Sequence, residues 1–437
     1  MGSGDRGSIC FDKKIIGVYM IKISKGLLLS VVTSSIVVAG GYKIPEQSLN
    51  SMALGAAYVA HTTGADTNYY NPANMSFMSN EKQYIEGGVT LAHLPTIDYT
   101  LTAPLSGYSE DENLPIPFFH YVSKAYGDYR WGVSLTAPGG LTKRWETPAQ
   151  KIYAEEFTLK IVEFNPNLSY RINDQLSIAG GLRLVYSEGI VTSNGDAMSA
   201  IVGDPRANIA RDMEGDSVEF GYNLALSYKP TSDIDIAVTY RSNIDLDEEG
   251  SATLSAGGMV LYSGDASVSV PLPAALNVAI SKTWGDKFTL EFNYERTFWS
   301  QYETLDFEYG GANIGALTPV FDAPMAKDWV DTNTFRVGAT IVMDSKITAM
   351  LAFAIDETPT IPKTLGFELP DSDAKVFSMG FRYQQTEALS WGLALLYDSK
   401  DPISVERGVA DNAILANGGS FAGGGAYLTT IGISYEF

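Results

Sequence analysis

The sequence has few of the residues that disulfides, metal sites and nucleophilic catalysis use. Its 437 residues include one cysteine, Cys10, and three scattered histidines, His61, His93 and His120. A lone cysteine offers no intrachain disulfide, and three separate histidines match no metal-binding motif. We therefore expect no disulfide framework, no thiol catalysis, no metal and no cofactor.

Basic residues are also scarce. The chain has 30 Lys and Arg against 51 Asp and Glu, a net charge of −21. Nucleic-acid binding needs a basic face, so we expect no nucleic-acid partner. No apolar run after residue 41 is long enough for a membrane-spanning helix, which argues against a helical membrane protein.

The amino-terminal region reads as a secretory leader. The stretch MIKISKGLLLSVVTSSIVVAGG begins at Met20 and carries Lys22 and Lys25, then an apolar run over 27–38, then small residues. A positive flank, a short apolar centre and a small-residue end are the three parts of a signal peptide. We assign residues 1–41 to an upstream segment and this signal, which also contains Cys10.

The rest of the chain alternates apolar and polar residues with a period of two. FTLEFNYE, residues 288–295, sets four apolar or aromatic side chains against Thr, Glu, Asn and Glu. LSIAGGLRLVY at 176–186 and VEFGYNLALSY at 218–228 follow the same pattern. Such segments are strands with one apolar and one polar face.

The connections between these strands alternate in length. Short turns fall at 125–128, 171–175, 229–233, 283–287, 344–346 and 385–388, and long loops fall near 102–114, 139–156, 192–216, 249–265, 309–327, 357–373 and 400–424. We expect fourteen antiparallel strands closed into a transmembrane β-barrel over residues 82–437. A soluble β-sandwich is the alternative, but polar faces such as Asp235, Thr239 and Arg241 would be costly in its dry core.

The carboxy-terminus supports an outer-membrane location. YLTTIGISYEF alternates aromatic and apolar residues and ends on Phe437, like the signal that the barrel-assembly machinery of Gram-negative outer membranes reads. We expect a monomeric, multi-pass protein of that membrane, in contact with its lipid and lipopolysaccharide. Both termini should be periplasmic.

Residues 42–81 do not alternate and are rich in small and turn-forming residues. A fourteen-stranded barrel is wide enough to leave an open lumen unless something fills it. We expect this segment to be a small hatch domain that plugs the barrel.

The hatch sequence SLNSMALGAAYVAHTTGADTNYYNPANM resembles that of the FadL family of outer-membrane transporters of long-chain fatty acids and other hydrophobic compounds. The motif that ends the hatch in this family is Asn71-Pro72-Ala73 here. The stretches that begin at Trp131, Phe164, Val270 and Arg296 resemble later strands of the family, in order. The resemblance implies passive transport of a hydrophobic small molecule, lipid or detergent through a pocket beside the hatch and sideways into the membrane.

The triplet Pro138-Gly139-Gly140 is the candidate lateral opening. Proline donates no ladder hydrogen bond, and paired glycines permit a bend or bulge in a strand. The alternative is that the triplet only opens a loop.

Substrate-binding candidates follow from the chemistry of the ligand. A fatty acid needs a cation for its carboxylate, but Val330 stands where the family often has lysine, and Arg183, Lys327 or Arg336 are the possible substitutes. This departure leaves a neutral hydrocarbon or aromatic substrate open. The hatch residues Met52, Leu54, Met75 and Phe77 are candidates for an apolar wall, or else pack against the barrel.

Other functions make different demands. A lipase-like barrel enzyme needs a histidine paired with Ser or Asp near the outer rim. A general porin would lack the hatch, and an adhesin would carry its function in the loops. The scattered histidines lead us to expect no enzyme.

Overall fold

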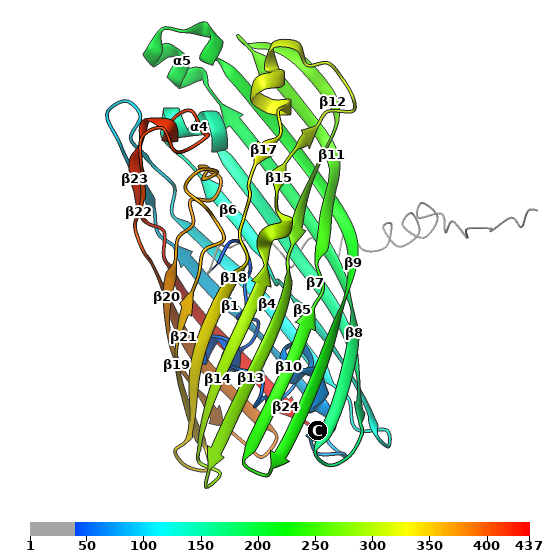
Figure 1. The fold of residues 1–437 in the computed structure, drawn as a ribbon. Coiled ribbons are helices and arrows are strands. Elements are labelled where there is room, and N and C mark those ends of the chain that lie inside the picture. Colours follow the sequence, from blue (N-terminus) through cyan, green and yellow to red (C-terminus); the bar gives the residue numbers. More distant parts are fainter. Residues whose placement is uncertain (1–39) are drawn as a thin grey trace, which may run out of the picture. The chain divides into compact units, whose positions relative to one another are not determined.

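The computed structural model describes residues 40–437, so the expected leader and Cys10 lie outside the described residues, apart from Gly40 and Gly41. Eighteen strands form one antiparallel sheet, in which β1 (Tyr84–Leu94) pairs with both β4 (Glu112–Val122) and β24 (Ala426–Glu436). The sheet therefore closes into a barrel (Figure 1). Each crossing of the chain from one end of the barrel to the other is called a stave. Four staves are made of two consecutive strands and the others of one, so the eighteen strands form fourteen staves, as predicted.

The remaining wall strands follow in chain order around the barrel. They are β5 (Tyr129–Thr136) with β6 (Gly140–Arg144), β7 (Glu156–Arg171), β8 (Leu176–Asn194), β9 (Ile209–Thr231), β10 (Ile234–Arg241) with β11 (Ile244–Ala256), β12 (Met259–Leu272) with β13 (Ala274–Trp284), β14 (Phe288–Phe298) with β16 (Phe307–Glu308), β18 (Thr332–Val342), β19 (Ile347–Asp356), β20 (Ala374–Gln384) and β21 (Leu389–Lys400).

The loops that connect the wall strands contain short strands and helices of their own. The loop strands are β2 (Ile97–Thr100), β3 (Gly107–Tyr108), β22 (Ile403–Val405) and β23 (Gly419–Gly423), which form one sheet, and the pair β15 (Thr304–Leu305) and β17 (Met325–Ala326). Helices of the loops are α4 (Pro148–Ala154), α5 (Asp196–Val202), η2 (Pro205–Ala207), η3 (Trp299–Gln301), η4 (Gly315–Leu317), η5 (Thr318–Asp322) and η6 (Leu415–Asn417). No helix among residues 40–437 is long and apolar enough to cross a membrane.

The wall is apolar outside and polar inside. On β14, Phe288, Leu290 and Phe292 are exposed, whereas Glu291 and Asn293 are buried. The same arrangement holds on β9, where Phe220 and Leu224 are exposed. A soluble β-sandwich would bury its apolar face, so this inverted pattern favours a barrel surrounded by lipid.

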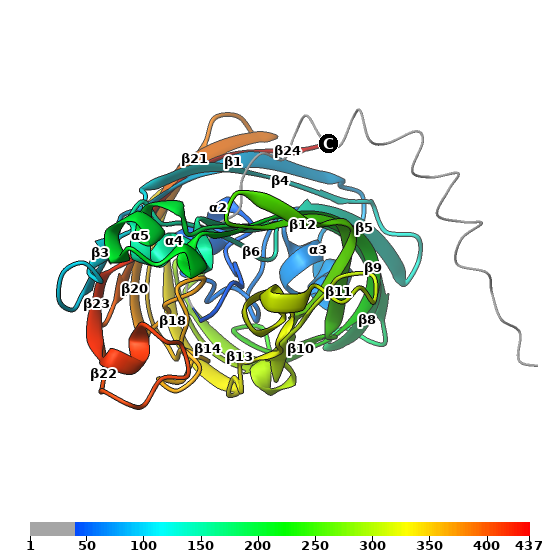
Figure 2. The same cartoon turned by 90° about the horizontal axis from the view of Figure 1, so that it is seen from above.

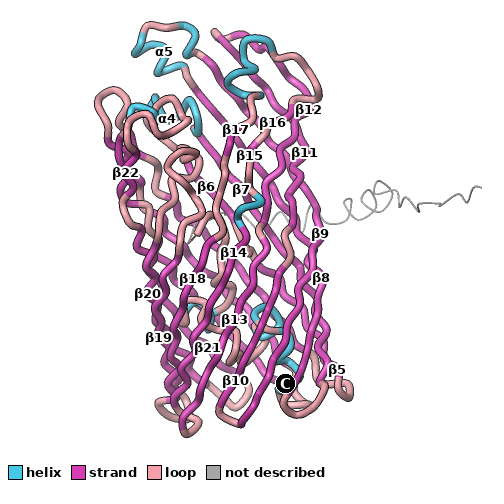
Figure 3. The backbone as a smooth tube through the Cα atoms, in the orientation of Figure 1, coloured by secondary structure: helices cyan, strands magenta, loops and turns pink. Residues whose placement is uncertain are grey.

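The loops agree with the predicted alternation except at one place. The six short turns lie at the predicted positions, at the end where the chain terminates, and α4 and α5 lie at the opposite end (Figures 1 and 3). The segment 249–265 is not a long loop. β11 and β12 continue through it and meet at a tight turn of Gly257 and Gly258, whose φ angles of 56° and 76° favour glycine. Small and polar residues conceal the strand pattern in this stretch.

The hatch, residues 42–81, lies inside the ring of strands (Figure 2). Its elements are α2 (Leu49–Ala53), α3 (Thr67–Tyr70) and the 3-10 helix η1 (Pro72–Phe77). The polar inner wall holds it in place. The carboxylate of Glu291 accepts hydrogen bonds from three successive backbone amides, those of Val59, Ala60 and His61, at 2.5, 2.9 and 2.8 Å.

Candidate functional site

The Asn71-Pro72-Ala73 motif ties the hatch together from within. The Asn71 side chain donates from Nδ2 to the carbonyl oxygen of Val59 at 3.0 Å and accepts from the amide of Ala73 at 3.2 Å. Pro72 begins η1, where its missing N–H would have no helical partner in any case. Outside the motif, Ser177 of β8 donates to the carbonyl oxygen of Ala73 at 2.7 Å. The motif therefore fixes one end of the hatch against the wall.

The third stave is interrupted at the predicted triplet. β5 ends at Thr136, and β6 begins at Gly140. β4 pairs with β5 only from Phe119 to Val122, and the upper part of β4, residues 112–118, pairs with β1 alone. Among the described residues, no ladder joins that part of β4 to β6, which pairs with β7 instead. We call this interruption between β4 and the third stave the window.

The amino-terminal part of the hatch forms backbone and side-chain hydrogen bonds with the interrupted stretch of the third stave. Ile44 donates its amide to the carbonyl oxygen of Pro138 at 2.9 Å, and Lys43 forms an isolated antiparallel bridge with Gly139. The Gln47 side chain donates to the carbonyl oxygen of Ala137 at 2.7 Å and accepts from its amide at 2.9 Å. Buried backbone groups need partners, so the kink is stabilised by the hatch.

The two sides of the window meet again at its upper edge. Glu110 donates its amide to the carbonyl oxygen of Arg144 at 2.8 Å. The Arg144 guanidinium also binds both carboxylate oxygens of Glu112, at 2.9 and 2.5 Å. The window is therefore bounded below by the Phe119–Leu135 pair and above by this contact.

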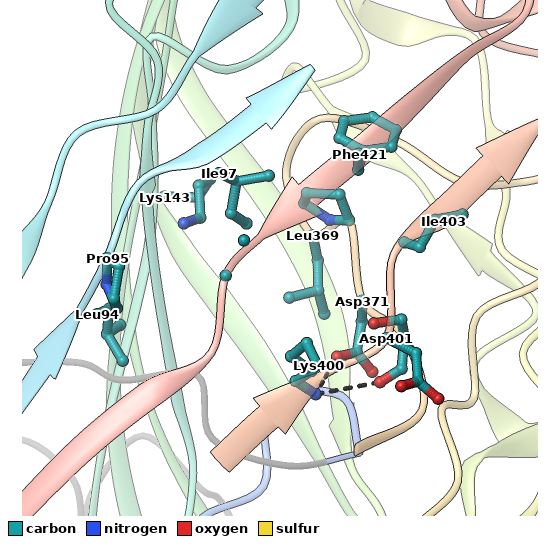
Figure 4. A pocket seen from close by; sticks show the side chains of 14 residues that line it. Leu94, Pro95, Ile97, Lys143, Leu369, Asp371, Lys400, Asp401, Ile403 and Phe421 are labelled. Carbon is teal, nitrogen blue, oxygen red and sulfur yellow. Dashed lines mark hydrogen bonds and ion pairs between the residues drawn. The ribbon is translucent and has the colours of Figure 1, made fainter. Parts of the chain in front are cut away.

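A cleft lies beside the window, and most of its lining residues belong to the long loops or to the strand ends next to them. Figure 4 shows this lining from close by. It holds about 510 Å³ of space, part of it open to solvent. Its apolar wall includes Leu94, Ile97, Leu369, Ile403 and Phe421, and its charged residues are Lys143, Asp371, Lys400 and Asp401. Such a mixture suits an elongated apolar ligand with one polar end.

Most charges of the cleft are neutralised by one another or by close neighbours. Lys400 Nζ lies 2.5 Å from Asp371 Oδ1, and Asp371 Oδ2 accepts from the amide of Gly41 at 2.9 Å. Asp401 pairs with Lys375 at 2.9 Å. Lys143 differs, because its side chain is buried and forms no hydrogen bond or ion pair within the described part of the chain.

The three predicted carboxylate-binding cations are all paired already. Arg183 lies 2.9 Å from Glu163, Arg336 lies 3.3 Å from Glu295, and Lys327 pairs with Glu368. None of the three lines the cleft. The two lysines that do line the cleft, Lys143 and Lys400, were not predicted from the sequence, although Lys143 follows Gly140 by only three residues.

The predicted apolar residues of the hatch lie apart from the cleft. Met52, Leu54 and Met75 are buried in clusters between the hatch and the wall. Phe77 is partly buried, with the Lys229 ammonium 5.1 Å from its ring centroid. Their predicted contact with substrate stays a prediction.

One histidine contacts a serine, so its surroundings bear on the enzyme alternative. His120 Nδ1 lies 2.8 Å from Ser134 Oγ, and Nε2 lies 2.8 Å from the carbonyl oxygen of Gln47. The carbonyl requires a proton on Nε2, so Nδ1 accepts from the serine hydroxyl, whose oxygen accepts from Asn68 Nδ2 at 2.7 Å. His120 and Ser134 are buried between hatch and wall, where this network connects the two.

The other two histidines lie elsewhere. His61 Nδ1 is 2.9 Å from Asp235 Oδ2, and His93 Nδ1 is 2.9 Å from Asn113 Oδ1. Within residues 40–437, no group of three or more His, Cys, Asp or Glu side chains is placed to hold a metal ion.

A closed wall with an apolar outer surface, a polar lumen and an internal plug defines an outer-membrane β-barrel transport protein. The model of a family described as outer membrane protein transport protein (OMPP1/FadL/TodX) matches residues 30–437. The chain belongs to this family, so it is a multi-pass protein of the outer membrane.

Individual relatives are distant in sequence but similar over nearly their whole length. The long-chain fatty acid transport protein of Escherichia coli is 23% identical over 414 residues, covering 85% of this chain and 90% of that protein. A Pseudomonas aeruginosa FadL homologue has a TM-score of 0.75 at 18% identity, covering 91% of this chain and 99% of its own. The Ralstonia pickettii toluene transporter TbuX has a TM-score of 0.66 at 18% identity, covering 89% and 98%.

Proposed function

We propose that this protein mediates passive uptake of hydrophobic small molecules across the outer membrane. The substrates are long-chain fatty acids or hydrocarbons, including aromatic ones. Related proteins carry both kinds of name, a long-chain fatty acid transport protein in Escherichia coli and a toluene transporter in Ralstonia pickettii. The substrate enters among the long loops, passes the cleft and leaves sideways through the window into the membrane.

The observation that carries this proposal is the lost ladder between the upper part of β4 and the third stave. Straight passage down the lumen would bring an apolar molecule to the hatch and then to water. Sideways passage brings it into lipid, and each buried methylene favours that route by about 0.8 kcal/mol. The exposed apolar residues on the outside of the wall support this route, because they favour contact of the outer wall with lipid.

The absence of enzymatic activity is part of this proposal. Its support is that His120 and Ser134 are buried between hatch and wall, where they also contact Gln47 and Asn68. We also propose that the protein is a monomer surrounded by lipid and lipopolysaccharide. The exposed Phe437 side chain would serve as the signal for the barrel-assembly machinery, with both termini periplasmic.

The test replaces Pro138-Gly139-Gly140 with Val-Thr-Val, which favours a continuous strand. Uptake of radiolabelled hexadecanoic acid and toluene is measured in cells that lack their own transporters of this family. Uptake should fall while binding of the same tracers to the cell surface persists. Gly87→Ala in β1 is the matched control, because an added Cβ would meet no atom closer than 3.7 Å. Undiminished uptake in a variant whose structure shows a continuous third stave would exclude the lateral route.

A further inference from the structure

We propose that the buried carboxylate of Asp356 binds the α-ammonium group of the mature chain, which forms when the leader is cleaved between Ala39 and Gly40. The ligand is a primary ammonium, and the protein supplies it from its own amino terminus. Gly40 and Gly41, expected above within the leader, then belong to the mature chain. The inference concerns how the hatch is anchored and does not depend on which substrate is transported.

The first argument is the position of Gly40, which is buried. A Cβ added to Gly40 would lie 3.0 Å from Asp356 Oδ2 and 3.4 Å from Oδ1. The nitrogen of Gly40 is bonded to the same Cα, so it lies within about 5.5 Å of that carboxylate. A terminal amine at this position can turn about the Cα–C bond of Gly40 and reach the carboxylate.

The contacts of Gly41 hold the chain in this position. Its amide donates to Asp371 Oδ2 at 2.9 Å. On the other side lies Trp299, because a Cβ added to Gly41 would stand 2.6 Å from the ring atom Cζ2. The φ angle of Gly41 is 77°, a conformation that favours glycine. Gly41 is therefore fixed between an acidic and an aromatic side chain, which keeps the nitrogen of Gly40 beside Asp356.

The second argument is the balance of charge around Asp356, where ion pairs and interactions through space connect the charged side chains. Five of these side chains carry carboxyl groups and three are cations: Glu46, Glu295, Asp356, Asp371 and Asp398, against Lys43, Arg336 and Lys400. Carboxyl groups are therefore in excess in a buried region. One further cation would reduce the cost of that excess.

Asp356 is the carboxylate that the three cations leave without an ion pair. They pair instead with other carboxylates, Lys400 with Asp371 at 2.5 Å, and Lys43 and Arg336 with Glu295 at 2.7 and 3.3 Å. Asp356 Oδ1 accepts from the hydroxyl group of Thr334. Within residues 40–437, Oδ2 accepts no hydrogen bond and Asp356 forms no ion pair, although the residue is only 4% exposed. This is the oxygen closest to Gly40.

A second carboxyl group also lacks a donor. Glu46 is 5% exposed, and its Oε2 is buried without a hydrogen-bond partner in the described chain. It belongs to the same cluster, since Asp356 acts on it through space. An ammonium group brings three donors. Besides Asp356, the carbonyl oxygen of Glu357 is in reach, because it lies 3.2 Å from the position of a Cβ on Gly40.

The sequence places the cleavage at the matching bond. Ala39 directly follows the apolar run over 27–38, and leaders end on a small residue. Hydrolysis of the Ala39–Gly40 peptide bond by a signal peptidase consumes one water and leaves a carboxylate on Ala39 and a primary amine on Gly40. The amine takes up a proton at neutral pH. The uncharged amide of the precursor gives Asp356 no cation, so the pair exists only in the mature chain.

The experiment uses the full chain, expressed with its own leader in a Gram-negative host. The intact mass of the protein purified from outer membranes identifies its first residue. The reaction of its α-amine with 2-pyridinecarboxaldehyde, a reagent for terminal amines, is then followed by mass spectrometry in a detergent with an uncharged headgroup. Each rate is divided by that of the same protein unfolded in hot dodecyl sulfate.

Two variants separate the ammonium from its partner. Asp356→Asn keeps the size of the side chain and removes the charge. A serine inserted between Ala39 and Gly40 moves the ammonium away from Asp356 and leaves the wall unchanged. Asp401→Asn is the matched control, because this carboxylate is half exposed and belongs to an ion pair with Lys375. Retained heat-modifiable mobility in each variant shows that the barrel has folded.

The mature chain should begin at Gly40, and its amine should react more slowly in the folded than in the unfolded protein. Asp356→Asn should raise the relative rate about tenfold, the usual size of one lost charge-assisted contact. The serine insertion should raise it similarly, and combining the two changes should add nothing, because the inserted chain no longer contacts the site. Asp401→Asn should leave the rate unchanged.

Several results would overturn the inference, and none of them bears on transport. One is a mature chain that begins at any residue other than Gly40. Another is an amine that reacts equally fast in the folded and the unfolded protein. An unchanged rate in Asp356→Asn, or an effect that adds to that of the insertion, would show that Asp356 does not hold the amine. The insertion leaves Asp356 in place, so an unchanged rate there overturns the inference even if Asp356→Asn fails to fold.

Discussion

Gly140 donates its backbone amide to the carbonyl oxygen of Tyr42 at 2.8 Å, so the first residue of β6 pairs with the beginning of the hatch. This contact joins two features that lie far apart in the sequence, the plug and the interrupted stave. The wall needs the hatch to satisfy its kinked backbone, and the hatch needs the kink for its own pairing. Disturbing either one should therefore disturb the other.

Gln47 offers the most direct test of this coupling. Its side chain makes both hydrogen bonds to the backbone of Ala137, and Gln47→Ala leaves that buried amide and carbonyl without a partner. Each unsatisfied group costs about 1–3 kcal/mol. We expect faster hydrogen exchange at residues 41–47 and 137–140, measured by mass spectrometry in detergent, with β19 and β20 unaffected. Exchange that rises equally over the whole barrel would indicate general destabilisation instead.

The motif residue Asn71 should be structural within the hatch. Asn71→Ala removes the hydrogen bonds to Val59 and Ala73 in a fully buried site, which costs about 1–3 kcal/mol for each group left unpaired. Tracer uptake should fall, while the heat-modifiable mobility of the folded barrel on gels stays intact. Asn80→Ala is the control, since Asn80 is exposed and just follows the hatch elements. Loss of the folded barrel would make Asn71 an assembly residue.

The architecture was predictable from the sequence because the environment imposes a simple rule. Lipid outside and polar groups inside give each strand a period of two, as on β14, and the turns alternate in length. The hairpin through Gly257 was missed because its strands extend on small and polar residues that lack that contrast. The fourteen staves and the internal helical segment followed from pattern alone.

The cleft could not be predicted in the same way. Whether a cation is free depends on carboxylates contributed by distant strands. Arg183, Arg336 and Lys327 looked available in the sequence, but Glu163, Glu295 and Glu368 neutralise them. The pairing of Gly41 with Asp371 spans 330 positions, and no local signal marks it.

The stability of the hatch should depend on pH through Glu46. This carboxyl group is buried, and burial raises its pKa to about 7, against the opposing influence of Arg336. Since the folded pKa exceeds the ordinary value, the native hatch holds a proton that the opened hatch releases. Stability is therefore fully present below about pH 4.5 and falls as pH rises to about 7, by at most about 3 kcal/mol.

Hydrogen exchange of the amides around Glu46, corrected for intrinsic rates, is the measurement. Protection should decrease between pH 5 and pH 8 in the unmodified protein and stay level in Glu46→Gln, which mimics the protonated acid. Equal slopes in the two proteins would assign the pH dependence to another group.

The last prediction concerns the plug itself. Deleting Tyr42–Met78 should raise single-channel conductance in planar bilayers, because the wide barrel then has an open lumen.

Glu291→Leu is the subtler change, since it removes the acceptor for the amides of Val59, Ala60 and His61 without removing the hatch. Three amides left without this acceptor should loosen the hatch and produce intermittent openings. Glu188→Leu serves as the control, since Glu188 pairs with Lys160 on the wall and, within residues 40–437, forms no hydrogen bond or ion pair with the hatch. An unmodified protein that already conducts like an open porin would show that the hatch does not block the lumen.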